Sequence, residues 1–190
     1  MKDITQQVVA LTLMALLTAS NTSHGRGLEG VSLPDSYQAG NTRLVLNGMG
    51  LREKLIFKVY VAGLYLPQTT GNADDIIRAD TAKALVIQFT RDIPRDKLVQ
   101  AYTEAFAGNA PELAARQKTN VDNFFAFLTD VKNGDRLSFV YEPGKGSTFT
   151  NNNAVKLVIS GKEFADLYLQ VYIGRKPPTP VLKRGLLGLK

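Results

Sequence analysis

The chain is 190 residues long, with 44% hydrophobic and 21% charged residues, a balance that is ordinary for one folded domain. It has no cysteine and one histidine, His24, which excludes disulfides, thiolate chemistry, multi-histidine metal sites and a histidine base, so we predict no metal, no cofactor and no catalytic residue. The formal net charge is +6, but the basic residues are scattered and do not alternate with aromatic residues, so we predict no nucleic-acid partner.

The N-terminal region contains an apolar run over residues 8–17, followed by small and polar residues through Ser23. Ten residues are too few to cross a bilayer as a helix, which takes about 20, and they suit the apolar region of a secretory signal peptide. We therefore predict a signal peptide over residues 1–23, a domain over residues 24–190 and a periplasmic location. The alternative is a buried N-terminal helix.

Strands are predicted for most of the first half of the domain. Residues 25–41 are rich in glycine and polar residues and predict an extended segment that leads into the domain. β-Branched and aromatic residues with a period of two then predict strands over residues 43–46, 55–66, 84–89, 136–141, 147–150 and 155–159. Residues 142–146 have the composition of a turn, so the segments on either side of them are expected to form a hairpin.

Helices are predicted after Pro94, where apolar residues recur at helical spacing. A second helical region is expected over residues 111–131, a third over 162–172 and a short final helix over 181–187. Together with the strands, these helices indicate an α+β fold, in which an antiparallel sheet is covered by helices on one face.

The densest group of basic residues lies at the C-terminus. We interpret it as the solvated face of an amphipathic helix, and the alternative is peripheral contact with an anionic membrane surface or an acidic partner. This C-terminal basic cluster consists of Arg175, Lys176, Lys183, Arg184 and Lys190.

A glycine-flanked arginine is the main candidate for ligand binding. Gly48 and Gly50 permit turn conformations that other residues avoid, so Arg52 can be aimed across a sheet. Its planar guanidinium suits a carboxylate or a phenolate, because it can donate two hydrogen bonds to one anionic group.

The strand after Arg52 carries the other candidate residues. Strand alternation places apolar residues, a phenol and a cation on one side, as in a ligand cleft, although a partly exposed sheet face would look similar. A straight strand would separate Arg52 from the phenol by about 26 Å, so a shared anion requires the chain to turn near residues 53–54. The residues on this side are Ile56, Lys58, Tyr60, Ala62 and Leu64.

Three motifs resemble the chalcone isomerase-like family, in its bacterial exported branch. The first is the Gly-x-Gly-x-Arg run over residues 48–52 followed by residues 58–66, and the others lie over residues 89–98 and 173–187. This resemblance implies an open-faced β-sandwich of the chalcone isomerase type, in which a large sheet and a layer of helices enclose a cleft.

The resemblance also implies roles for individual residues. Arg52 matches the arginine with which this family holds an anionic group, and Tyr60 falls where the fatty-acid-binding relatives have a tyrosine and plant chalcone isomerases have a threonine. The catalytic tyrosine and asparagine of those isomerases would fall near Pro94 and Ala101, whose side chains donate no hydrogen bond. A shift of one residue would bring Tyr102 to the asparagine position.

These observations predict a periplasmic, non-catalytic binding protein for a small amphipathic anion, with a fatty acid as the leading candidate. Arg52 and Tyr60 would hold the carboxylate, and Ile56, Ala62 and Leu64 would line an apolar tunnel. One alternative is an isomerase of the intramolecular lyase type that acts on a chalcone-like conjugated ketone. Another is an envelope interaction module that docks through the C-terminal basic cluster.

Overall fold

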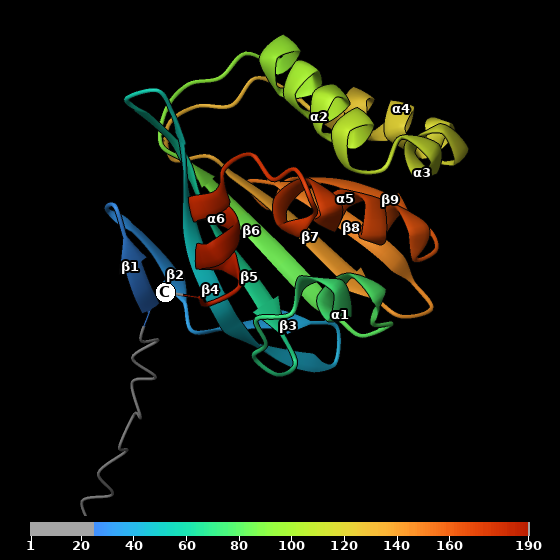
Figure 1. The fold of residues 1–190 in the computed structure, drawn as a ribbon, viewed down its shortest axis with the longest axis horizontal. Coiled ribbons are helices and arrows are strands. Elements are labelled where there is room, and N and C mark those ends of the chain that lie inside the picture. Colours follow the sequence, from blue (N-terminus) through green and yellow to red (C-terminus); the bar gives the residue numbers. More distant parts are fainter. Residues whose placement is uncertain (1–24, 190) are drawn as a thin grey trace, which may run out of the picture.

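A computed structural model of the chain describes residues 25–189, which fold into one antiparallel sheet, a separate hairpin and a layer of helices (Figure 1). The strands of the first half are β1 (Gly25–Leu28), β2 (Val31–Pro34), β3 (Ser36–Ala39), β4 (Thr42–Lys54), β5 (Phe57–Leu66) and β6 (Lys83–Phe89). Three more follow after the central helices: β7 (Arg136–Glu142), β8 (Gly146–Asn151) and β9 (Val155–Ile159). The helices are α1 (Ala73–Arg78), α2 (Arg95–Asn109), α3 (Pro111–Arg116), α4 (Lys118–Phe127), α5 (Glu163–Ile173) and α6 (Pro180–Leu186).

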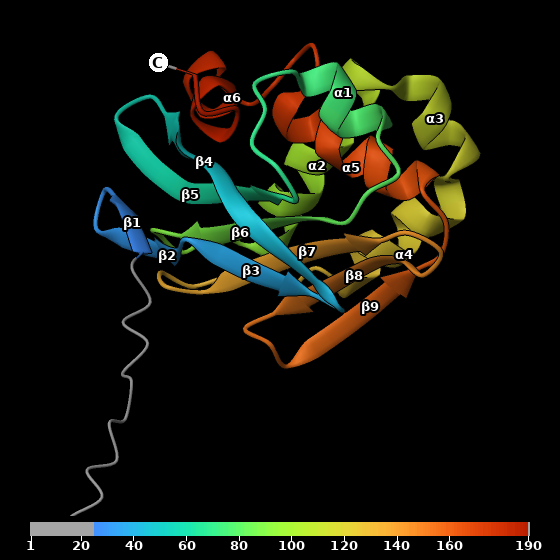
Figure 2. The same ribbon diagram turned by 90° about the horizontal axis from the view of Figure 1, so that it is seen from below.

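The main sheet has seven strands in the order β3-β4-β5-β6-β7-β8-β9, and every neighbouring pair is antiparallel. Strand β3 also contacts β6 and β7, so the sheet curls over on itself into a half-barrel. Figure 2 shows the helices gathered above one face of this sheet, while the β1–β2 hairpin lies at its other side. The predicted α+β architecture is confirmed.

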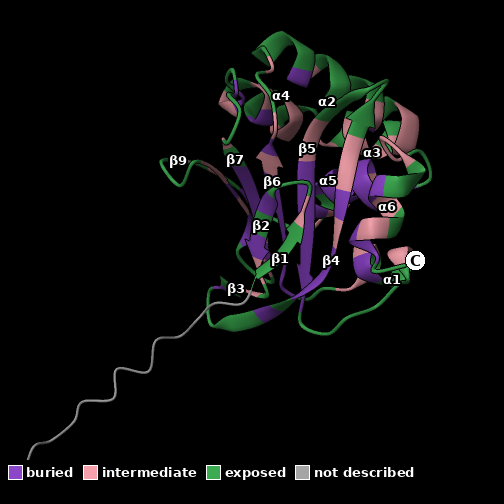
Figure 3. Ribbon diagram, turned by 90° about the vertical axis from the view of Figure 1, so that its left-hand side faces the viewer, coloured by how far each residue is buried: buried purple, intermediate pink, exposed green. Residues whose placement is uncertain are grey.

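Two hydrophobic cores form on the two faces of the sheet. The larger core lies between the sheet and the helices and contains most of the buried aromatic residues, with α5 at its centre. The smaller core lies on the opposite face, where β2 and β3 pack against β4, β5 and β6. In Figure 3 the central strands are therefore mostly in the colour of buried residues, although the sheet is open at its edges.

Strand β4 is much longer than predicted, because it includes the glycine-rich segment that the sequence suggested was a turn. Neither Gly48 nor Gly50 has a positive φ, so neither forms a turn. Helix α6 instead packs directly on these glycines: a Cβ at Gly48 would lie 2.1 Å from the carbonyl oxygen of Gly185, and one at Gly50 would lie 2.4 Å from that of Leu182. The two glycines therefore permit close packing of helix on strand.

The other predicted elements lie close to their expected positions, with three differences. Residues 111–131 form two short helices, α3 and α4, which end at Phe127, and the predicted extended segment over residues 25–41 forms β1, β2 and β3. Helix α1 was not predicted; Asn72 caps its N-terminus by accepting hydrogen bonds from the backbone amides of Asp74 and Asp75. Within residues 25–189, no helix combines the length and the apolar character that crossing a membrane requires. The predicted signal peptide lies outside the described residues.

Candidate functional site

A cavity of about 410 Å³ opens between the end of the β4–β5 hairpin, helix α2 and the C-terminal end of α5. This volume lies within the range of small-molecule sites. Its apolar walls come from the sheet and from both helices, and they include Val59, Ile87, Phe89, Ile93, Leu98, Ala101, Ala105 and Val171. The cavity therefore offers an apolar interior that is bounded by the sheet on one side and by helices on the other.

Arg52 and Tyr60 both line this cavity, because a tight hairpin brings them together. They are directly opposite each other in the β4–β5 register, and the chain reverses at Leu55 and Ile56 between them. Residues opposite each other in an antiparallel pair project to the same face with Cβ atoms about 5 Å apart. The turn that a shared ligand requires is present, at residues 55–56, two residues beyond the predicted position.

Two backbone carbonyls hold the Arg52 guanidinium in place. Its Nη1 atom donates to the carbonyl oxygen of Glu53 at 2.9 Å and to that of Pro178, in the segment between α5 and α6, at 3.0 Å. Nε and Nη2 make no hydrogen bond within residues 25–189, and no carboxylate there forms an ion pair with Arg52. This leaves one edge of the guanidinium available for a bidentate acceptor.

Tyr60 adds a neutral phenol to the lining of the same cavity. Its ring packs edge-on against Phe89, with ring centroids 6.0 Å apart, and its hydroxyl makes no hydrogen bond within the described part of the chain. Burial raises the pKa of Tyr60, the nearby phenol of Tyr102 raises it further, and the charge of Arg52 opposes the rise. Tyr60 therefore stays protonated at neutral pH and can donate one hydrogen bond.

A β-bulge explains how two consecutive residues face the cavity. The pairing shifts between Arg52 and Glu53, so that Arg52 pairs with Tyr60 while Glu53 pairs with Lys58, and Val59 has no partner in the register. Val59 and Tyr60 both line the cavity, which regular strand alternation would not allow. Such a bulge changes the direction of a side chain beside a binding site.

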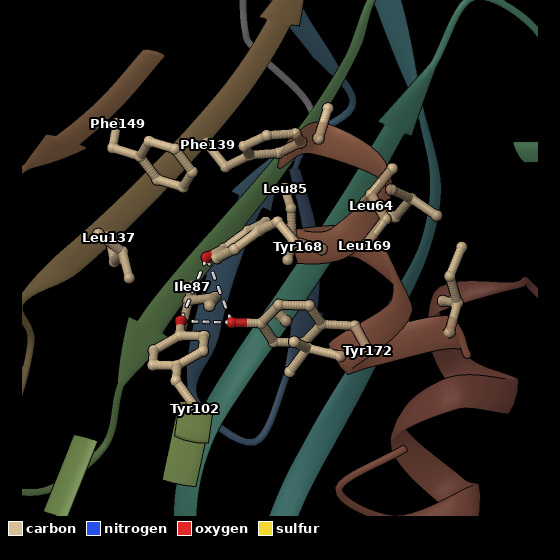
Figure 4. Packing of buried hydrophobic residues seen from close by; sticks show 14 of the residues in the cluster. Leu64, Leu85, Ile87, Tyr102, Leu137, Phe139, Phe149, Tyr168, Leu169 and Tyr172 are labelled. Atoms are coloured by element: carbon tan, nitrogen blue, oxygen red, sulfur yellow. Dashed lines mark hydrogen bonds between the residues drawn. The ribbon is translucent and has the colours of Figure 1, made fainter. Parts of the chain in front are cut away.

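Three tyrosines from α2 and α5 form a closed ring of hydrogen bonds at the inner side of the cavity (Figure 4). The hydroxyl of Tyr102 lies 2.6 Å from that of Tyr172 and 3.2 Å from that of Tyr168, and the last two are also 3.2 Å apart. Tyr102 and Tyr172 line the cavity. Burial raises the pKa of all three phenols, so they remain neutral. The ring lets each hydroxyl donate and accept one bond.

The charged residues around the cavity are mostly cationic. Lys54, Lys97 and Lys176 line it together with Arg52, and Glu104 is the one carboxylate in the lining. Glu104 accepts a hydrogen bond from Gln100, and neither Lys54 nor Lys176 forms an ion pair within residues 25–189. The excess of positive charge attracts an anionic group to the opening.

Three residues predicted to line the cavity lie elsewhere. Ile56 is in the hairpin turn, 87% exposed, because the chain reverses there before β5 begins. Ala62 and Leu64 face the helices as expected, but both are fully buried in the larger core. Figure 4 shows Leu64 packed beside Leu169 of α5, so the space predicted as a tunnel is filled by that helix.

The other candidates have structural or peripheral positions. Lys58 is exposed and pairs with Glu29 at 2.6 Å, so it belongs to the solvated surface and not to the cavity. Pro94 lies outside the cavity lining, whereas Ala101 and Tyr102 belong to it. The C-terminal basic cluster is dispersed: Lys176 lines the cavity, and Lys183 donates a hydrogen bond to the carbonyl oxygen of Gly174 at 2.9 Å. Lys190 lies outside the described residues.

Several lining residues were not predicted, chiefly Phe89, Lys97, Tyr172 and Lys176. Tyr168 and Tyr172 of α5 are four residues apart, a spacing that puts them on one helix face but gives no sign that this face meets Tyr102 of α2. Within the part of the chain that the structure describes, no group of three or more histidine, cysteine, aspartate or glutamate side chains is placed to hold a metal ion.

Comparison with known proteins places this fold in a family. Residues 25–188 match the profile of the family described as chalcone isomerase-like. The fold is similar to the crystal structure of a fatty-acid binding protein from Arabidopsis thaliana, with a TM-score of 0.63 and 16% identity, over 83% of this chain and 92% of that one. Comparison with curated protein sequences found no match. The chain belongs to the chalcone isomerase-like family.

Proposed function

We propose that this protein is a non-catalytic binding protein for a small amphipathic anion, and that a fatty acid is its ligand. The observation that carries the proposal is the guanidinium of Arg52, which lies at an apolar cavity without a carboxylate partner among residues 25–189. A charge beside an apolar wall is stabilised by an ion of opposite sign. The fatty-acid binding activity named for the Arabidopsis protein supports the choice of ligand.

In this proposal the carboxylate accepts two hydrogen bonds from the free edge of Arg52 and a third from the hydroxyl of Tyr60. The acyl chain then lies against the apolar walls formed by Phe89, Leu98 and Val171. The three hydrogen-bonded tyrosines, Tyr102, Tyr168 and Tyr172, and the packed core behind them close the inner end of the cavity. A volume of about 410 Å³ suits one small ligand in the range of ordinary binding pockets.

The isomerase alternative has less support from the site. Ring closure of a chalcone would use hydrogen-bond donors aimed at the reacting groups. Ala101 has no side-chain donor, and Pro94 lies outside the cavity. The hydroxyl of Tyr102 is already hydrogen-bonded to the hydroxyls of the two tyrosines of α5. Arg52 and Tyr60 remain, and together they suit a carboxylate.

We also propose that the protein is exported and acts in the periplasm. The support is the apolar run over residues 8–17, which precedes the folded domain in the sequence. N-terminal sequencing of the protein recovered from the periplasmic fraction of the producing cells would test this. A mature chain that begins near residue 24 is expected, and an intact Met1 in the cytoplasmic fraction would contradict it.

Mass spectrometry of lipids extracted from the purified protein tests the ligand. We expect fatty acids to be recovered with the parent protein and to be strongly depleted with Arg52→Ala. The matched control is Arg43→Ala, because Arg43 is an exposed arginine of the same strand, far from the cavity lining. That control should retain the ligand. Recovery of no acyl species from the parent, or equal recovery from Arg52→Ala, would contradict the proposal.

A further inference from the structure

The tip of the β4–β5 hairpin exposes three consecutive apolar residues. Leu55 is 89% exposed, Ile56 87% and Phe57 49%, and the other exposed large apolar side chains of the described chain do not form such a run. Figure 3 shows the end of this hairpin in the colour of exposed residues, and in Figure 2 it stands out from the body of the molecule. Single exposed apolar residues are ordinary, whereas a contiguous group marks an interaction site.

The turn is also built against its local preference. Leu55 has φ of 57°, in the left-handed region where glycine or asparagine is usual and where a leucine is strained. A two-residue hairpin turn with a positive φ at its first central residue favours glycine there, which would be less strained than leucine. Leu55 is therefore not the residue that the turn geometry favours, and the exposure of Leu55 and Ile56 gives them little part in the core.

Cations surround the apolar tip. Lys54 and Lys58 flank it in the sequence, and the guanidinium of Arg91 packs on the Phe57 ring, 4.6 Å from its centroid. The carboxylates near it are Glu53 in the same strand and Glu29, which pairs with Lys58 at 2.6 Å. With the cationic lining of the cavity beside it, this end of the molecule has an excess of positive charge.

We propose that the hairpin tip, residues 54–58, docks on an anionic lipid surface, with Leu55 and Ile56 inserted among the headgroups and Lys54 against lipid phosphates. Three side chains are too few for a stable protein interface, which buries roughly 1,200 Å² or more. They suit shallow insertion into a membrane, where apolar contact and basic charge act together. Lys54, at one end of the tip, and Val59, the residue that follows its other end, both line the cavity, so docking turns the cavity opening toward the membrane.

The biological use of this surface rests on the proposed function. Fatty acids partition into bilayers, so a cavity that opens at the lipid surface shortens the path between the bilayer and the site. Membrane contact through the tip differs from contact through the C-terminal basic cluster, in which Lys183 is engaged by a backbone carbonyl.

Sedimentation with vesicles tests the docking surface. The probes are phosphatidylcholine vesicles with and without phosphatidylglycerol, and the tip variant is Leu55→Asn/Ile56→Ser, in which asparagine suits the positive φ. We expect the parent to bind the anionic vesicles and the tip variant to bind about tenfold more weakly. The variant should keep a melting temperature at least equal to that of the parent, because the strained leucine is removed.

Two control variants separate this surface from others. Val158→Ser removes an apolar side chain of similar exposure, 61%, on β9, and Arg184→Glu changes the charge of the C-terminal basic cluster. Both are expected to bind vesicles within about twofold of the parent. The proposal is overturned if the parent does not sediment with anionic vesicles, or if the tip variant binds as strongly as the parent. It is also overturned if Arg184→Glu alone abolishes binding, or if the tip proves to hold two copies of the chain together in sedimentation velocity.

The ligand proposal and the docking proposal fail separately. If acyl species are recovered from the parent but the parent does not bind vesicles, the ligand proposal is supported and the docking proposal is overturned. Tip-dependent vesicle binding by a parent without bound acyl species would support the docking surface and count against the ligand.

Discussion

Arg52 holds a charge that no carboxylate of the described chain neutralises. Two main-chain carbonyls accept hydrogen bonds from its Nη1 atom and so fix the orientation of the guanidinium. The Nε and Nη2 atoms have no side-chain partner among residues 25–189. Tyr60 stands opposite it across the hairpin and adds a neutral donor. A cation and a neutral phenol at an apolar cavity recognise a carboxylate by charge and by hydrogen-bond direction together.

The hydroxyl of Tyr60 is expected to contribute a modest part of the binding energy. Tyr60→Phe keeps the ring against Phe89 and removes the donor, so fatty-acid affinity should fall by about 1 kcal/mol, or roughly fivefold. Calorimetric titration with a soluble medium-chain fatty acid would measure this. Tyr37→Phe is the control, since Tyr37 packs on Tyr65 in the smaller core. Equal fatty-acid affinity of Tyr60→Phe and the parent would show that the Tyr60 hydroxyl does not bind the carboxylate.

The burial of Lys83 leads us to predict that the stability of the protein depends on pH in the alkaline range. This lysine is 1% exposed, and its Nζ donates to the carbonyl oxygens of Ile76 and Ala79 at 2.7 Å each, which caps the end of α1. Burial lowers its pKa to about 8 in the folded protein, and the charge of Lys162 contributes. Between that value and the ordinary lysine pKa near 10.5, the unfolded chain binds a proton that the folded chain has released.

The free energy of unfolding should therefore increase as the pH rises from about 8 toward 10, and the stabilisation is lost as the pH falls through 8. Urea unfolding of the parent and of Lys83→Met across this range would isolate the effect, because the other titrating groups are shared. A stability difference between the two proteins that stays constant with pH would contradict this assignment.

Among the individual residues, the chemistry of Arg52 and Tyr60 could be predicted and the position of Ile56 could not. A guanidinium and a phenol suggest a carboxylate whatever the fold. The location of the hairpin turn, however, depends on Leu55 adopting a positive φ, which runs against its own preference. Strand alternation continued through that point placed Ile56 on a cavity wall, where the structure has an exposed turn.

At the scale of elements, the β4–α6 contact holds the cavity wall in place. The segment before α6 supplies the carbonyl of Pro178 that binds Arg52, and α6 itself packs on Gly48 and Gly50. Asn47 reinforces this contact by donating to the carbonyl oxygen of Leu186 at 2.8 Å from a bulge in β4. The orientation of Arg52 therefore depends on a helix more than 120 residues away in the sequence.

Gly50→Ala should disturb this contact. The added methyl group would lie 2.4 Å from the carbonyl oxygen of Leu182, so α6 must move, and we expect a loss of about 2 kcal/mol in stability with weaker ligand binding. Gly27→Ala is the matched control, because nothing lies within 4 Å of the Cβ it would add in β1. Denaturant unfolding of both variants would show the difference, and equal stability would exclude tight helix packing at Gly50.

The types of most elements could be predicted from periodicity, while the bounds of β4 could not. Glycines at positions 48 and 50 have the composition of a turn, and only the arrival of α6 explains them as strand residues. The short strands β1 and β3 lack a clear apolar alternation, and β3 contacts β6 and β7, which follow much later in the chain. The structure of these segments therefore depends on contacts between elements that are far apart in the sequence.

For the whole molecule, the aromatic core behind the cavity limits what can enter. Phe124 of α4 is fully buried and touches rings from α2, α5 and β8, among them Tyr102 at 4.9 Å and Phe149 at 5.0 Å between ring centroids. This cluster joins the helical layer to the sheet and backs the tyrosine ring. Cavity depth and overall stability are therefore coupled through the same side chains.

Phe124→Ala should cost about 4 kcal/mol of stability, since it removes a buried ring from a packed core. It should also lengthen the cavity, so that the variant binds longer acyl chains relative to shorter ones than the parent does. Val158→Ala, at an exposed position, should leave both properties unchanged. Thermal unfolding and a chain-length series of fatty acids would measure the two effects. A smaller loss, below about 1 kcal/mol, would mean that the core is not tightly packed at Phe124.

The most direct test compares the affinity of a medium-chain fatty acid with that of its methyl ester, in the parent protein and in Arg52→Ala. The ester keeps the apolar chain and removes the charge. The account predicts that the parent prefers the acid by about tenfold or more and that this preference disappears in Arg52→Ala. Equal affinity of the parent for acid and ester, or a preference that survives in Arg52→Ala, would contradict it.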